Sequence, residues 1–265
     1  MGGGVNIKLT LCSLASGSKG NAIYVGVDKT KVLIDAGLSG RELLRRLKYI
    51  GVHGEDLDAI IVSHEHTDHV RGIQSLSRQS NLPICTNYPT LSHIKSLTNR
   101  INVREFTSGE SFSIKDLLFQ PFSVPHDAAD PVGFIIRYKE IKIGIATDLG
   151  FATKLVIERL KKCDLLVLES NHDDEMLKLG PYPWQIKQRI RSRLGHLSNQ
   201  QTVTLFKEIY HKDLKHIILF HISEMNNRPE KAHAGITRLL KGCKYHPIDI
   251  SIAEQQRVGK TISIT

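Results

Sequence analysis

The feature that most constrains this chain is a dense group of metal-binding side chains directly after an apolar run. The run Ile60-Ile61-Val62, closed by Ser63, is typical of a buried strand. Three histidines and one aspartate follow within six positions: His64, His66, Asp68 and His69. Imidazole and carboxylate groups together bind zinc, iron or manganese in hydrolytic sites that keep a position for water. A histidine-rich surface loop is the alternative, and so dense a ligand set argues against it.

The spacing of these residues predicts how they divide between ions. A tight turn after the strand, into a helix that begins near Val70, brings His64 and His66 onto one ion. Asp68 and His69 then lie one step further around the turn and suit a second ion. We therefore expect two divalent ions, with zinc or manganese favoured and iron also compatible with these ligands.

Other predicted strands also end in a histidine or an aspartate. These strand-exit residues are Asp35, His64, His126, Asp148 and His221. If the strands lie in packed sheets with their ends on one edge, seven candidate ligands meet there, the number expected for two ions that share a carboxylate. Asp148 directly follows an uninterrupted apolar run, so we expect it to be the shared ligand. Asp35 is expected to orient a neighbouring ligand, with helix capping as the alternative.

The remaining apolar patterns predict strands and helices that alternate along most of the chain. We expect strands at 7–12, 22–26, 31–34, 60–63, 101–106, 117–124, 132–138, 141–146, 164–168, 215–220, 248–253 and 261–264, short helical or extended segments at 82–85 and 89–96, and helices at 41–49, 70–77, 185–193, 199–210 and 229–240. The connection that ends in Ser16-Gly17-Ser18-Lys19-Gly20-Asn21 is rich in small residues. Its backbone N–H groups suit close approach to a ligand or a phosphate, and a flexible hairpin loop is the alternative.

Composition limits the class of protein. A chain of 265 residues fits one large domain, which we assign to residues 1–265, and 40% hydrophobic and 24% charged residues are ordinary for a soluble protein. The sequence has no membrane-length apolar run and no signal-peptide pattern at its N-terminus. Four scattered cysteines, Cys12, Cys85, Cys163 and Cys243, are interpreted as core residues in a reducing compartment, so we expect a cytoplasmic protein. The net charge of +9 favours polyanionic partners such as nucleic acids.

The motif His64-x-His66-x-Asp68-His69, followed in order by His126, Asp148 and His221, resembles the signature of the metallo-β-lactamase superfamily. The resemblance covers nearly the whole chain. It implies an α/β fold with four αββα layers, in which two β-sheets lie face to face with helices outside. By position, it assigns one metal ion to His64, His66, His126 and Asp148. It assigns the other to Asp68, His69, Asp148 and His221.

Within that superfamily the chain is similar to the YycJ/WalJ-type hydrolases. The similarity rests on the 16–21 loop, on Glu169-Ser170-Asn171-His172-Asp173, on Gly195-His196-Leu197-Ser198-Asn199 and on His221-Ile222-Ser223. It implies exonuclease activity on DNA from the five-prime end. The chain has no room for the separate insertion of about a hundred residues that some RNA-processing relatives use, nor for the long arm of the tRNA-maturing relatives. The resemblance to the DNA exonucleases makes DNA, rather than RNA, the favoured nucleic-acid partner.

The predicted chemistry is phosphodiester hydrolysis assisted by two metal ions. Asp68 is expected to orient the attacking water as well as to bind metal. His196 is expected to protonate the leaving oxygen or to contact the phosphate, with Glu169 as its orienting partner. A structural role at a helix N-terminus is the alternative for His196.

Two other classes of function are weighed against the nuclease. One is hydrolysis of a small thioester or lactone by the same ions. The other is a regulatory binding module without activity, which the presence of all seven candidate ligands disfavours. A β-lactam substrate is disfavoured because the sequence lacks a secretion signal and a zinc-binding cysteine at the expected place.

Overall fold

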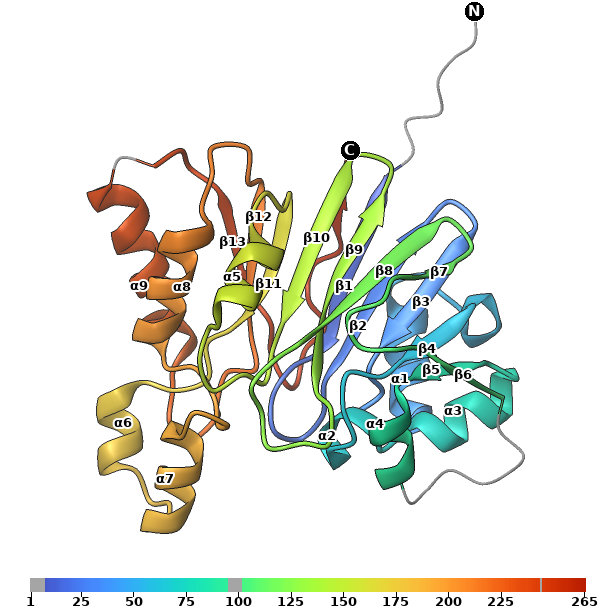
Figure 1. The fold of residues 1–265 in the computed structure, drawn as a ribbon, viewed down its shortest axis with the longest axis horizontal. Coiled ribbons are helices and arrows are strands. Elements are labelled where there is room, and N and C mark those ends of the chain that lie inside the picture. Colours follow the sequence, from blue (N-terminus) through green and yellow to red (C-terminus); the bar gives the residue numbers. More distant parts are fainter. Residues whose placement is uncertain (1–7, 95–101, 244) are drawn as a thin grey trace, which may run out of the picture.

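The computed structural model describes residues 8–94, 102–243 and 245–265, and these residues form two seven-stranded mixed sheets that face each other (Figure 1). In spatial order, the first sheet contains β14 (Ile262–Ile264), β1 (Leu9–Ala15), β2 (Ala22–Val27), β3 (Thr30–Ile34), β4 (Ala59–Ile61), β5 (Ile84–Thr86) and β6 (Val103–Glu105). The second contains β13 (Asp249–Ile252), β12 (His216–Phe220), β11 (Leu165–Glu169), β10 (Ile141–Ala146), β9 (Val132–Tyr138), β8 (Leu117–Ser123) and β7 (Phe112–Ile114).

Helices cover the outer face of each sheet. The first sheet is covered by α1 (Gly40–Tyr49) and α3 (Ile73–Ser80), with α2 (Thr67–Val70), α4 (Tyr88–His93) and the 3₁₀ turn Gly54–Asp56 nearby. The second is covered by α5 (Lys154–Leu160), α8 (Asn199–Ile209) and α9 (Pro229–Gly242). The remaining helices, α6 (Asp174–Leu179) and α7 (Trp184–Arg191), form an excursion at the lower left of Figure 1. The predicted αββα sandwich is confirmed.

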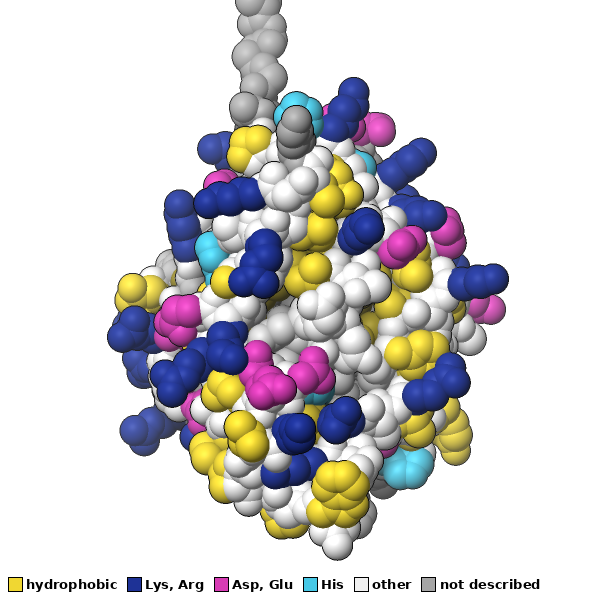
Figure 2. Space-filling view, turned by 90° about the vertical axis from the view of Figure 1, so that its left-hand side faces the viewer, with side chains coloured by type: hydrophobic (Ala, Val, Ile, Leu, Met, Phe, Trp, Pro, Cys, Tyr) yellow, Lys and Arg dark blue, Asp and Glu magenta, His cyan; other side chains and the backbone are white. Residues whose placement is uncertain are grey.

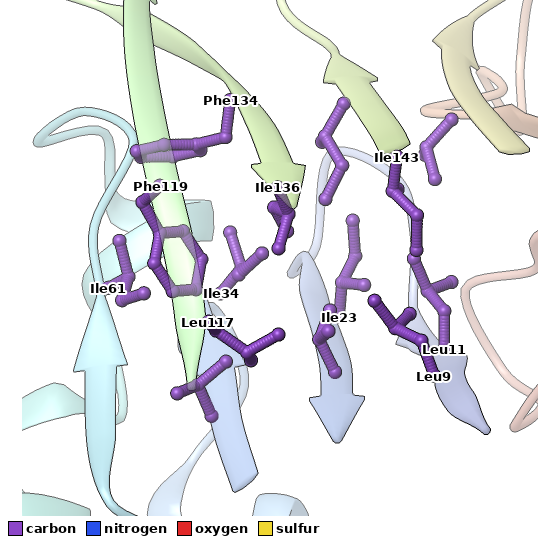
Figure 3. Close-up of a cluster of buried hydrophobic side chains, with 14 of the residues drawn as sticks. Leu9, Leu11, Ile23, Ile34, Ile61, Leu117, Phe119, Phe134, Ile136 and Ile143 are labelled. Atoms are coloured by element: carbon purple, nitrogen blue, oxygen red, sulfur yellow. The ribbon is translucent and has the colours of Figure 1, made fainter. Parts of the chain in front are cut away.

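Apolar side chains that point alternately to the two faces of each sheet produce these layers. In β12, Ile217 and Leu219 pack under the helices, whereas Ile218 and Phe220 point between the two sheets. A strand with both faces buried needs apolar residues at every position, and β12 has four in a row. Figure 3 shows the layer between the sheets, where side chains such as Phe119 and Phe134 of one sheet face Ile34 and others of the opposite sheet.

The strand order explains where a site can form. The pairs β3–β4 and β4–β5 are parallel, as are β10–β11 and β11–β12. Parallel neighbours end on the same edge of a sheet, so the residues that follow them are brought together. Asp35 and His64 therefore leave the first sheet on one edge, and Asp148 and His221 leave the second in the same way.

Several predicted boundaries are wrong. The helix expected at 70–77 is two helices that meet at Arg71 and Gly72, and the first begins at Thr67. Gly72 permits this close junction because a Cβ there would clash with the carbonyl oxygen of Leu38. The short elements β7, α5 and α6 were not predicted from the sequence. Positions 7, 95, 96 and 101 of the expected elements, and the N-terminal signal considered for residues 1–6, lie outside the described residues.

The cysteine and membrane predictions have separate outcomes. Cys12, Cys85 and Cys163 are buried and unpaired, as expected of core residues, but the prediction was wrong for Cys243, which is exposed. It follows the last residue of α9, so its side chain lies at a helix end rather than on an inward face. None of the helices in the described part of the chain could cross a lipid bilayer. The assignment of residues 1–265 to one domain stays a prediction.

Candidate metal centre

All seven predicted ligands lie together where strands of the two sheets end. Residues 64–69 follow β4, and α2 carries Asp68 and His69. The second sheet supplies His126 after β8, Asp148 after β10 and His221 after β12. Among the described residues, metal-capable atoms within 4.8 Å of one another form four overlapping groups: His64, His66 and His126; Asp68, His69 and His221; His64, His69 and Asp148; Asp148, Glu169, His196 and His221.

These groups agree in part with the predicted division of ligands. The first two groups each lie within one predicted ligand set, and Asp148 belongs to both of the other groups. Its Oδ1 lies 3.5 Å from Nε2 of His221 and its Oδ2 lies 3.4 Å from Nε2 of His69. This central position suits a carboxylate that two ions share, and the bridging role itself stays a proposal.

Hydrogen bonds orient two of the histidines that are predicted ligands. His126 donates from Nδ1 to the carbonyl oxygen of Gly195 at 3.1 Å, and His66 donates from Nε2 to the carbonyl oxygen of Asp127 at 3.1 Å. Each ring therefore keeps its other nitrogen for the cluster. Outer partners of this kind fix the tautomer and the ring plane of metal-binding histidines.

Two ring nitrogens support the presence of a cation. Nε2 of His64 and Nε2 of His221 are buried and have no hydrogen-bond partner among the described residues. Leaving a buried polar atom unsatisfied costs about 1–3 kcal/mol, and a metal ion satisfies such a ring nitrogen once it has lost any proton. With neighbouring imidazoles and carboxylates, these atoms fit a divalent zinc, manganese or iron ion. The residues thus fit a metal-binding site.

Asp35 orients His69, as the sequence suggested. Its Oδ2 accepts hydrogen bonds from Nδ1 of His69 and from the hydroxyl of Ser63, each at 2.8 Å. Its Oδ1 accepts from the backbone N–H of Ser63, also at 2.8 Å. Nε2 of His69 consequently faces Asp68 and Asp148. Helix capping is not the role of Asp35, because the N-terminus of α1 is capped by Ser39.

Three site residues have left-handed backbone conformations. The φ angles of Asp35, Asp148 and His221 are +58°, +56° and +54°. Each follows the end of a strand by one or two residues, so the chain turns sharply there and directs the side chain to the shared edge. Residues other than glycine rarely adopt this conformation, which costs on the order of 1–3 kcal/mol and clusters at functional sites.

The buried histidines of the site differ in their pKa, which is lowered at His64 and raised at His69 and His221. Burial lowers the pKa of His64 well below its usual value, and His69 lowers it further. Burial also acts to lower the pKa of His69, but three carboxylates, led by Asp148, outweigh it and raise this pKa well above the usual value. Burial is likewise outweighed at His221, where Asp148 is again foremost in raising the pKa to about 10. Although burial acts to raise the pKa of Asp148, the same two histidines hold it well below its usual value.

Glu169 joins His196 to the metal-capable cluster. Its Oε1 lies 2.7 Å from Nδ1 of His196 and 3.3 Å from Nδ1 of His221, and the His196 and His221 rings stack with centroids 5.0 Å apart. Its Oε2 accepts from the N–H groups of Leu149 and Leu197 at 3.0 and 3.1 Å. Burial acts to raise the pKa of Glu169, but His196, followed by His221, lowers it to about 2. The predicted partnership of Glu169 and His196 is thus present as a contact, and its catalytic role stays a proposal.

The 16–21 loop is packed against the site rather than free. The hydroxyl of Ser16 accepts from the backbone N–H of His221 at 2.6 Å, and the amide of Asn21 donates to Oδ2 of Asp68 at 3.1 Å. Gln255 holds the loop through Lys19 N–H and the Gly20 carbonyl oxygen. The loop was predicted to approach a ligand, but its contact between Asn21 and Asp68 was not predicted, because no spacing rule relates two residues 47 positions apart.

The fold and this cluster define the class of metal-dependent hydrolases. The beta-lactamase superfamily domain matches residues 30–222. The chain is 36% identical to the exodeoxyribonuclease YycJ of Bacillus anthracis over 231 residues, which cover 86% of this chain and 88% of that protein. It is 35% identical to the exodeoxyribonuclease WalJ of Streptococcus pneumoniae over 229 residues, covering 83% and 84% of the two chains.

A solved structure agrees in fold. The metallo-beta-lactamase fold protein YhfI of Bacillus subtilis superimposes with a TM-score of 0.76 at 17% sequence identity, covering 97% of this chain and 100% of that one. This chain therefore belongs to the metallo-β-lactamase superfamily, in the family of YycJ and WalJ.

Proposed function

We propose that the protein is a nuclease that uses two divalent metal ions and degrades DNA from the five-prime end. The observation that carries the proposal is its 36% identity, over 88% of the relative's length, to a protein named exodeoxyribonuclease. The metal-capable cluster supplies ligands for the ions, and the net charge of +9 favours a polyanionic substrate. Four free cysteines suit the reducing cytoplasm, where we place the protein.

The ligand sets follow the two halves of the cluster. His64, His66 and His126 would hold one ion together with Asp148. Asp68, His69 and His221 would hold the other, again with Asp148. Bound zinc or manganese, or iron, supplies Lewis acidity: it lowers the pKa of water and neutralises charge on the phosphate.

The protein's own groups complete the chemistry. Asp68 is partly exposed beside the ligand cluster, so its carboxylate is placed to orient the attacking water. His196 is held by Glu169 through Nδ1, which leaves Nε2 to protonate the leaving oxygen or to contact a phosphate oxygen. Glu169 keeps His196 in that tautomer because its own second oxygen is fixed by two backbone N–H groups.

The test begins with metal analysis of the purified protein. The loaded protein is then assayed on single- and double-stranded DNA and RNA labelled at either end. We expect close to two ions per chain and release of label from the five-prime end of DNA. Turnover of small thioesters or lactones with intact DNA would move the alternative class ahead. Metal-loaded protein that turns over none of these substrates would favour the binding module.

Asp148→Ala tests the shared ligand. It should lose metal from both positions, because each predicted set depends on this carboxylate. Asp249→Ala is the matched control, since that carboxylate is 88% exposed on β13. Two ions still bound in the Asp148 variant would remove it from the bridging role.

A further inference from the structure

The excursion formed by α6 and α7 exposes an apolar and basic surface beside the metal centre. α7 has no buried residue, although every other helix of eight residues or more that the structure describes buries one face or packs against a core. Trp184 is 67% exposed and Leu179 is 80% exposed. Large apolar side chains gathered on a free surface commonly mark a binding site.

The α7 part of the excursion is positively charged. α6 begins with Asp174 and Glu175, but no acidic residue occurs between Glu175 and Glu208. α7 carries Lys187, Arg189 and Arg191, and Arg193 follows two residues after the helix. Within the described part of the chain, neither Lys178 nor Arg191 has an acidic partner. Figure 2 shows Lys and Arg side chains beside hydrophobic ones at the lower end of the molecule, the level at which α7 lies in Figure 1.

The C-terminal end of α7 is connected directly to the metal centre. Arg189 forms an ion pair with Asp127, whose carbonyl oxygen accepts a hydrogen bond from His66. The backbone N–H of His196 donates to the carbonyl oxygen of Ile190 at 2.9 Å. A strand of nucleic acid with a phosphate at the ions therefore meets Arg189 first and the N-terminal end of α7 later.

Helix geometry gives the distance between Trp184 and Arg189 along α7. At about 1.5 Å of rise per residue, Trp184 lies roughly 7.5 Å along the axis from Arg189, or about two nucleotides at the ~3.4 Å rise of stacked bases. Trp184, Gln188 and Arg191 recur at helical spacing and share one exposed face. An aromatic ring next to cations is the arrangement that proteins use to stack bases of a single strand while holding its phosphates.

We propose that α7 is the grip for the single-stranded end of the substrate, with Trp184 stacking on a base about two nucleotides beyond the phosphate nearest Arg189 and Arg191 contacting a nearby phosphate. This inference rests on the proposed nuclease function and adds the form of the substrate: an unpaired or frayed end long enough to reach from the ions past Arg189 to Trp184.

Trp184 is the one tryptophan of the chain, so its fluorescence reports the contact directly. The metal-loaded protein is titrated with a single-stranded phosphorothioate oligonucleotide of ten nucleotides, which resists hydrolysis. Saturable quenching is expected, and it should be absent with inorganic phosphate or a dinucleotide. Binding without any change in fluorescence would overturn the stacking contact.

Variants then separate the grip from the chemistry. Trp184→Ala should weaken oligonucleotide binding and degradation about 5- to 100-fold, and Trp184→Phe should retain most of both. Hydrolysis of bis-nitrophenyl phosphate should be unchanged in both variants. Tyr49→Ala is the matched control, because this aromatic side chain is 75% exposed at the far end of α1. Arg191→Gln should reduce the salt dependence of binding by about 0.7 in log–log slope, the value for one phosphate of a single strand.

The outcomes distinguish the two proposals. If the wild-type protein cleaves neither DNA nor the small phosphodiester, the proposed nuclease function fails and the grip fails with it. If it cleaves both and Trp184→Ala cleaves DNA as fast as wild type, the nuclease stands and the grip is wrong. Equal losses for Trp184→Ala on DNA and on the small ester, or a lowered melting temperature, would show that Trp184 acts through the fold and would also overturn the grip.

Discussion

At the scale of single residues, the site depends on backbone conformations that are unfavourable in isolation. Asp35, Asp148 and His221 all lie in the left-handed region. Each accepts or donates hydrogen bonds through its side chain or its backbone, such as the bond from His221 N–H to Ser16 and the bond from the Thr147 hydroxyl to Asp148. The tight turns place carboxylate and imidazole groups where an extended exit from the strand would not.

His196→Ala tests the division between chemistry and metal binding. The variant should keep its metal and its fold, because the seven predicted ligands do not include His196, but it should lose ~10²–10⁴-fold in turnover of DNA. The loss should shrink for a nitrophenyl phosphodiester, whose leaving group departs without a proton. Rates on both substrates are compared with metal content. Equal losses on both would indicate phosphate binding, and loss of metal would show that His196 is itself a ligand.

Proton release should accompany metal binding. The carboxylates around His69 and His221 raise the pKa of both rings above the usual value, so we expect both to be imidazolium cations at pH 7 in the metal-free protein. Each must lose one proton to bind metal, so binding should release about two protons and should weaken as the pH falls through about 10, the pKa of His221. Titration calorimetry in buffers of different ionisation enthalpy measures the number. The same apparent enthalpy in every buffer would contradict this assignment.

At the scale of elements, α1 supports the site from a distance. Arg46 is buried on α1 and donates to the carbonyl oxygens of Leu14 and Gln255 at 2.7 and 3.1 Å. Its Nε donates to Glu42 one turn earlier at 2.7 Å. The side chain of Gln255 in turn holds the 16–21 loop. A helix outside the sheet is thus linked to the loop that contacts Asp68.

Glu42→Gln should therefore reduce stability in a way that depends on pH. Hydrogen bonds from Arg45, foremost, and from Arg46 lower the pKa of Glu42 to about 2. A lowered carboxyl pKa stabilises the folded state above the unfolded pKa, and this contribution is lost as the pH falls through the folded pKa. We expect a loss of about 1 kcal/mol at pH 7 that disappears between about pH 4.5 and pH 2. Urea unfolding measures it.

The control for this prediction is Glu158→Gln on α5, whose carboxylate is 67% exposed and pairs with Lys161. It should change the unfolding free energy by less than about 0.5 kcal/mol. A constant difference between wild type and Glu42→Gln from pH 7 to pH 2 would show that the charge of Glu42 is not the cause.

At the scale of the whole molecule, the features with a local sequence signal could be predicted, and the features that depend on tertiary packing could not. Buried strands and the ligands at their ends are predictable because apolar runs and strand-exit residues are local features. The boundary at Thr67 and the helices α5 and α6 were missed, since short helices have weak periodicity and their boundaries depend on tertiary packing. The contact of Asn21 with Asp68 depends on the packing of distant segments and has no local signal.

Metal removal should weaken the association of the two sheets. Each predicted ligand set takes side chains from both, as His64 and His66 follow β4 whereas His126 follows β8. An ion bound there links the sheets only in the folded state, so at a hundred times its dissociation constant it adds about 2.7 kcal/mol per site. Chelation should lower the melting temperature by roughly 10–20 °C for two sites. Asp148→Ala should remove most of this difference, and Asp249→Ala should keep it. A melting temperature that chelator leaves unchanged in the wild-type protein would show that the bound ions do not link the sheets.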